Sequence, residues 1–160
     1  MAAPDFQTLL NFSDNLATAV AAVFSSDGLP AYAPRGKQEL PKERLDVLSS
    51  GWARASGQMV RDAAGHWHYS HYAGSLTVVV ISPRGDAESA ARHGARVGRA
   101  RYLLSESARL LTPTLLPYYG ILDIAAAGEN PFQDDTTDTD RTELTWTPQI
   151  QILPEAIPIA

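Results

Sequence analysis

Leu76–Thr77–Val78–Val79–Val80–Ile81 is the stretch of sequence that decides the fold. It is almost continuously apolar and rich in β-branched side chains, a composition typical of a strand that is buried on both faces. We therefore predict a central strand here. Burial of both faces requires helices, and the sequence predicts two long ones. The expected fold class is α+β, a mostly antiparallel sheet flanked by two long helices.

The two predicted helices lie on either side of this strand in the sequence. Residues 5–25 repeat apolar side chains at three- and four-residue spacing, with Asp5 as the N-cap and Asp27–Gly28–Leu29–Pro30 as the stop signal. The second helix is predicted over residues 86–111, with Asp86 as its N-cap and Pro113 beyond its end. Its Gly94 and Gly98 leave a shallow spot on the helix surface.

The remaining strands are predicted around the central one. Residues 44–81 have the pattern of a β-meander, with strands at 44–50 and 53–60 and an alternating segment at 66–72. A short strand is expected at 121–126. Residues 143–152 alternate polar and apolar side chains, which indicates one buried and one exposed face. Because Pro148 cannot donate to a strand ladder, we expect this closing strand to be an edge strand or to contain a bulge.

Composition indicates one globular unit. The 160 residues are 44% hydrophobic and 19% charged, and cysteine is absent. We expect a single domain over residues 1–160 without disulfides or thiolate metal sites. Met1–Ala–Ala–Pro4 does not have the pattern of an export signal, and no apolar run is long enough for a membrane span. No membrane partner is expected.

The net charge of −5 is concentrated in one segment. Residues 129–143 contain six acids and one base, −6 + 1 = −5, so the rest of the chain is balanced. This excludes a generally basic nucleic-acid-binding protein. The acids Asp134, Asp135, Asp138 and Asp140 lack the glycine and the spacing of an EF-hand, so we interpret them as a solvated acidic loop that could contact a neighbouring subunit.

The histidine-rich segment is the candidate metal site. On a strand, His66 and His68 share a face, and His71 follows nearby. A metal-dependent enzyme using His66, His68 and His71 is the alternative. Because no second ligand motif accompanies them, we interpret the segment as an aromatic-rich hairpin whose imidazoles are solvated or bonded across strands. Without cysteine, a Gly-x-Ser-x-Gly elbow or a phosphate-binding loop, we expect no catalytic residues, no cofactor and no enzyme activity.

Three arginines form the other candidate site. Arg92, Arg96 and Arg99 have i, i+4, i+7 spacing, which would place them in one line on the second helix. Three interpretations stay open: contact with DNA phosphates, pairing with the acidic loop of a neighbouring subunit, or an ordinary solvated face.

The order of these parts resembles the tail terminator proteins of long-tailed bacteriophages and related head–tail completion proteins. The resemblance spans nearly the whole chain and rests mainly on its layout. The segments that carry it are Tyr72–Ala–Gly–Ser–Leu–Thr–Val–Val–Val–Ile–Ser–Pro–Arg84, the spacing of His93, Val97, Arg101 and Leu104, Leu116–Pro–Tyr–Tyr119, and residues 140–152 followed by Pro154.

The resemblance implies a structural virion protein. Such proteins form a ring, typically a hexamer, that terminates the tail tube and joins it to the head-side connector or head-completion protein. It would be located at the head–tail junction, after assembly in the cytoplasm of the host bacterium, with non-specific contact to DNA in the lumen. Alternative assignments within this class are a neck, head-closure or tail-tube subunit. Pro148 and the histidine-rich segment depart from the pattern of the family.

Overall fold

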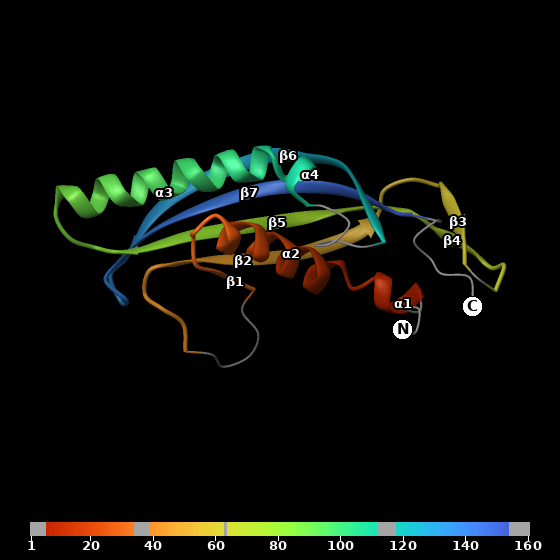
Figure 1. Cartoon of the computed structure of the whole chain (residues 1–160), viewed down its shortest axis with the longest axis horizontal. Helices are drawn as coiled ribbons and strands as arrows, with labels where there is room; N and C mark the ends of the chain where they lie inside the picture. Colours follow the sequence, from red (N-terminus) through yellow and green to blue (C-terminus); the bar gives the residue numbers. More distant parts are fainter. Residues whose placement is uncertain (1–5, 34–38, 63, 112–117, 154–160) are drawn as a thin grey trace.

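The fold is known from a computed structural model, which describes residues 6–33, 39–62, 64–111 and 118–153. Figure 1 shows a five-stranded sheet in the order β1-β2-β5-β7-β6, with a small β3–β4 hairpin beyond its end. The elements are α1 (Phe6–Leu9), α2 (Phe12–Ser26), β1 (Ala31–Tyr32), β2 (Arg44–Arg54), β3 (Met59–Arg61), β4 (Trp67–Tyr69), β5 (His71–Pro83), α3 (Ala87–Ser105), α4 (Ser107–Leu110), β6 (Tyr119–Asp134) and β7 (Thr139–Ile152).

The mostly antiparallel sheet is confirmed. All pairings between its strands are antiparallel except that of the two-residue strand β1 with β2. The predicted central strand lies within β5, which pairs with β2 on one side and β7 on the other. The α+β class is therefore correct.

The two long helices do not flank the sheet, which corrects the prediction. The core unites Leu76, Val78 and Val80 of β5 with apolar residues of both α2 and α3, so both helices pack on the same face. In Figure 1 both lie in front of the sheet, and among the described elements no helix packs behind it. The described residues thus form a two-layer sandwich, with both long helices on one face of the sheet.

Burial of Ile81 on that other face explains why the sequence suggested two covering layers. Ile81 is fully buried, and its cross-strand neighbours are Arg44 on β2 and Arg141 on β7. Long arginine side chains can cover an apolar neighbour with their methylene groups while the guanidinium stays in water. A continuous apolar run therefore does not require a second helical layer.

Both long helices are interrupted near an end. The first predicted helix divides into α1 and α2 at Asn11, whose ψ of 60° leaves the helical region and whose side-chain amide donates to Asp14 at 2.9 Å. The predicted N-cap Asp5 lies outside the described residues. At Gly28, φ is 85°, which confirms the predicted stop. Asp86 caps α3 by accepting from the Ser89 amide at 3.1 Å, as predicted, but α3 ends at Ser105 and a short α4 follows.

The closing strand β7 is not an edge strand. It lies between β5 and β6, and β6 forms the edge instead. Pro148 pairs with Ile124 of β6, and the β5–β7 ladder skips the position opposite Pro148. The irregularities lie in β6, at Ile121/Asp123 and Ala126/Gly128. The period-two alternation of β7 was correctly predicted, since its even-numbered residues from Thr142 onward are buried.

Trp52 holds the end of the sheet nearest the β3–β4 hairpin. Its ring packs with Phe12, centroid to centroid 4.9 Å, and its indole nitrogen donates to Ser49 at 2.8 Å. The ring also lies directly on Gly74 of β5, where an added Cβ would come within 2.5 Å of it. Gly74 is therefore the residue that lets the indole contact the backbone of the sheet.

Candidate functional site

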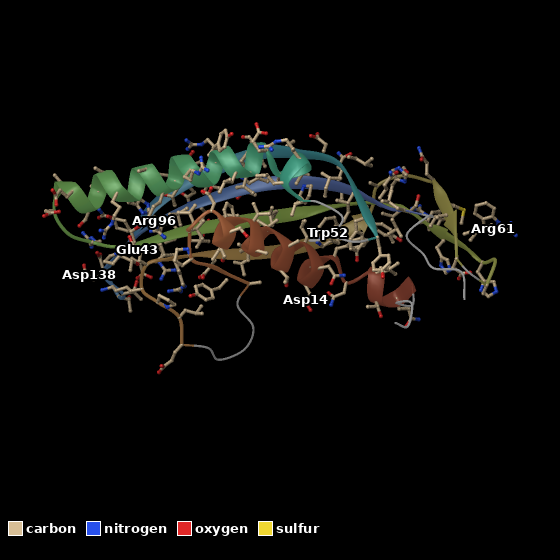
Figure 2. The ribbon with its side chains drawn as sticks, in the orientation of Figure 1. Asp14, Glu43, Trp52, Arg61, Arg96 and Asp138 are labelled. Atoms are coloured by element: carbon tan, nitrogen blue, oxygen red, sulfur yellow. The ribbon has the colours of Figure 1, made fainter. Side chains whose placement is uncertain are left out.

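A polar cluster fixes α3 to the sheet. The His93 ring shares hydrogen bonds with the hydroxyls of Ser82, at 2.7 Å, and Thr142, at 2.9 Å. Arg96 donates to the Ile81 carbonyl at 2.9 Å and to the Ser82 hydroxyl, and its guanidinium lies 3.8 Å from Glu43. Figure 2 shows Arg96 and Glu43 close together at one end of the molecule. The cluster joins α3, β5 and β7.

The electrostatics of this cluster favour an uncharged imidazole. Burial lowers the pKa of His93, and the positive charge of Arg96 lowers it further, while Asp140 opposes both. Burial likewise lowers the pKa of Arg96, against the effect of Glu43. Because the Ser82 side chain is buried and bonded to both neighbours, its hydroxyl is not presented to a substrate. The arrangement is suited to holding a helix in place.

The three predicted arginines do not form one exposed line. Arg96 is only 8% exposed, whereas Arg92 and Arg99 reach solvent. Arg92 pairs with Glu43 at 3.1 Å, and Arg99 with Asp27 at 2.5 Å. The sequence did contain a signal for this difference. Arg96 is four and seven residues before Ala100 and Leu103, which places it on the apolar face of α3.

The predicted acidic loop, with Asp134, Asp135, Asp138 and Asp140, is a tight turn between the long strands β6 and β7, and we call it the acidic turn. Asp135 pairs with Arg84 at 2.6 Å, with Asp138 4.0 Å from the same guanidinium, and Asp134 lies 3.5 Å from Arg141. The side chains of Asp135 and Asp138 are nevertheless 90% and 70% exposed. Asp140 is half-buried near His93. The turn therefore keeps its acids together at one end of the molecule.

The three predicted histidines do not form one cluster, because His66 and His68 face the same carboxylate while His71 bonds elsewhere. His68 pairs with Asp62 at 2.6 Å, the ring of His66 lies 3.7 Å from the same carboxylate, and His71 bonds to Ser70 at 2.8 Å. The hydrogen bond to His68 is the main cause that lowers the pKa of Asp62. Within the described ranges, no group of three or more His, Cys, Asp or Glu side chains is placed to hold a metal ion.

The edge strand β6 is the most exposed part of the sheet. Of residues 122–133, all but Ile124 are exposed, including Leu122 and Phe132. Its inner side pairs with β7, and the strand order ends at β6. A long, exposed edge offers unpaired backbone groups to another chain. The sequence predicted only its first residues as a strand.

In the described parts of the chain, no helix is both long and apolar enough to cross a membrane.

Comparisons with known proteins give structural similarities but no match of sequence. The chain matches no protein-family model, and no curated protein matches its sequence. Among solved structures, it is similar to a chain in the virion of a native gene transfer agent (GTA) particle. The TM-score is 0.51 at 14% sequence identity, over 87% of this chain and 95% of the other. At this identity the similarity shows a shared fold, one that occurs in a phage-like particle.

Proposed function

We propose that this protein is a structural component of a phage-like virion, where it forms a ring at the head–tail junction. The ring would terminate the tail tube and join it to the head-side connector or head-completion protein. The observation that carries the proposal is the fold shared with the gene transfer agent chain over nearly the whole of both chains. Because one fold can serve several functions, the surfaces must support the assignment.

Two surface features support an assembly function. The exposed edge of β6 can accept a strand from another virion chain, a contact made mainly by backbone groups. The acidic turn gathers charge at one end, so contacts between copies would join unlike surfaces, as a closed ring with heterologous interfaces requires. A hexamer is the ring size that we propose, assembled in the host cytoplasm.

The polar cluster around His93 and Arg96 supports a role without catalysis. Its side chains are bonded to one another and to the backbone of β5, which fits a rigid subunit. Of the three arginines on α3, Arg92 and Arg99 have exposed side chains. These two would contact the phosphates of DNA passing through the ring, without sequence specificity.

Labelling of intact particles tests the proposal. A short tag at a chain terminus, detected by immunogold electron microscopy, should appear once per particle, where head meets tail. The purified chain should form rings in negative stain, and these should cap the ends of purified tail tubes. Label along the whole tail would indicate a tube subunit instead. Label on tail-less heads would indicate a neck or head-closure protein, and absence from particles would contradict a virion role.

A further inference from the structure

The outer face of the β3–β4 hairpin is the most distinctive apolar surface of the molecule. Met59, Trp67 and Tyr69 are 45%, 60% and 40% exposed, although they lie in two three-residue strands. Of the eight large hydrophobic side chains exposed among the described residues, three are therefore on this one hairpin. Such a concentration on a small projecting element indicates a contact surface.

The register explains why these side chains share a face. Met59 pairs with Tyr69 and Arg61 with Trp67, while Val60 pairs with His68 on the opposite face. Val60 is buried in the core, so it anchors the hairpin with the other face turned outward. The aromatic residues alternate with the histidines singled out in the sequence, and these aromatic residues are the ones turned to solvent.

Arginines complete this surface, which we call the aromatic platform: Arg54, Met59, Arg61, Trp67 and Tyr69. The guanidinium carbon of Arg54 lies 4.0 Å from the centre of the Tyr69 ring, and that of Arg61 lies 5.3 Å from the centre of the Trp67 ring. Tryptophan, tyrosine, arginine and methionine are the residue types enriched at the centre of protein interfaces. The one acid of the hairpin, Asp62, is bound to His68, on the face opposite the platform.

The platform and the acidic turn lie at opposite ends of the molecule. Figure 2 places Arg61 at one end of the long axis and Asp138 at the other. One end therefore presents aromatic rings with two cations. The other presents the carboxylates of Asp135 and Asp138, which stay largely exposed although both lie within 4.0 Å of Arg84. The two surfaces are complementary in charge, and one molecule cannot bring them together.

We propose that the aromatic platform of one copy binds the acidic turn of the next, and that this head-to-tail contact closes the ring. The inference rests on the proposed ring and names the surfaces that form it. Such a heterologous contact repeats with the same rotation at each copy and closes when the rotations sum to a full turn. A nucleic-acid partner fits less well, because guanidinium groups already lie over both rings and the chain is net negative.

A charge exchange tests the contact directly. Arg61→Asp and Asp138→Arg should each weaken self-association about tenfold or more, measured by sedimentation velocity and native mass spectrometry. An equimolar mixture of the two variants should restore rings. In a ring of alternating copies, every contact then has either the native pair or the exchanged one. Raising the salt from about 0.05 M to about 0.5 M should weaken the wild-type ring.

Aromatic substitutions give a second, independent measurement. Trp67→Ala with Tyr69→Ala should abolish ring formation while the circular dichroism spectrum stays native, since both side chains are exposed. Tyr102→Ala is the matched control, because Tyr102 is also half exposed and lies under a guanidinium, that of Arg99 at 5.1 Å. The control should assemble like the wild type.

Several results would overturn the contact. If wild-type rings form and every platform and turn variant assembles equally well, the contact is wrong while the proposed ring stands. If the charge-exchange mixture fails to restore rings although each variant is folded, the pairing is wrong. If the double alanine variant loses binding to single-stranded DNA but still assembles, the platform is a nucleic-acid surface. A wild-type chain that stays monomeric up to about 100 µM, with and without tail tubes, overturns both proposals.

Discussion

Gly74→Ala should destabilise the protein, although replacing a glycine within a strand by alanine normally does the opposite. The new methyl carbon would lie 2.5, 2.6 and 2.9 Å from three atoms of the Trp52 ring. Carbon atoms in proteins rest about 3.5–4.0 Å apart, so the ring would have to retreat by about 1 Å. The Ser49 hydroxyl and Phe12 hold the ring on its other sides, so this movement disturbs both contacts.

The expected loss of unfolding free energy is about 2–4 kcal/mol. Overpacking of a closely packed site costs about 1–3 kcal/mol, and weakening the Trp52–Ser49 hydrogen bond adds about 1 kcal/mol. For a chain of this length, the melting temperature should fall by about 5–10 °C. Urea unfolding followed by tryptophan fluorescence measures the free energy, and near-UV circular dichroism reports the displaced indole.

Gly94→Ala is the matched control. Gly94 lies in α3, and an added Cβ there would have no atom within 4 Å. Alanine has the higher helix propensity, so this variant should gain about 0.5–1 kcal/mol. A smaller ring at position 52 should relieve the clash, so Trp52→Phe with Gly74→Ala should lose less than the sum of the two single changes. If Gly74→Ala is as stable as the wild type, the packing of Trp52 on β5 is wrong.

Three further predictions concern the polar cluster and the exposed edge. Arg96→Ala should lower the free energy of unfolding by about 2–3 kcal/mol, measured with urea, because the Ile81 carbonyl and Ser82 lose a charged donor. Arg92→Ala should change it by less than about 1 kcal/mol, since Arg92 is exposed. Equal effects of the two substitutions would contradict the inward placement of Arg96. The lowered pKa of His93 means that the unfolded chain binds more protons near and below the imidazole's ordinary pKa of about 6.5, so stability should fall as the pH falls from about 7 to 5. His93→Gln should remove that part of the pH dependence, and an unchanged profile would show that His93 titrates normally. Ala127→Lys, on the exposed face of β6, should lower co-sedimentation with tail tubes about tenfold without changing the melting temperature, and unaltered binding would exclude the β6 edge as the contact.

The sequence predicted the elements that have strong local signals. Local sequence was enough to predict three features: the β-branched run of β5, the alternation of β7 and the Asp86 cap. The interruption at Asn11 was missed because the apolar spacing continues across it.

The strand β6 was mostly missed because its structure depends on a distant partner. Its second half contains Gly128, Asn130 and Pro131, residues that disfavour strands, and nearly all of it is exposed. Pairing with β7 along its whole length supplies the hydrogen bonds that local preference does not. The turn between the two strands is short, which keeps that pairing local enough to form readily.

The candidate site was predicted in composition and missed in arrangement. The acids do lie in a turn before the closing strand, and the three arginines do lie on one helix, as predicted. The spacing of Arg96 from Ala100 and Leu103 indicates the apolar face of α3, but it could not identify Ser82 as the partner, since that contact depends on how α3 packs on β5. The exposure of Trp67 and Tyr69 could not be predicted from the alternation of residues 66–72, because only the anchoring of Val60 in the core determines which face of the hairpin is turned outward.

The sheet has two sides with unlike chemistry. One lies beneath α2 and α3, and the other carries a row with Arg44, Ile81 and Arg141 beside a row with Asp46, Val79 and Glu143. Inverting a subunit would therefore exchange its helix-covered face for the face that carries the charged rows. Copies that share one orientation therefore build an object with polarity, whose top and bottom can recognise different neighbours although a single polypeptide supplies both.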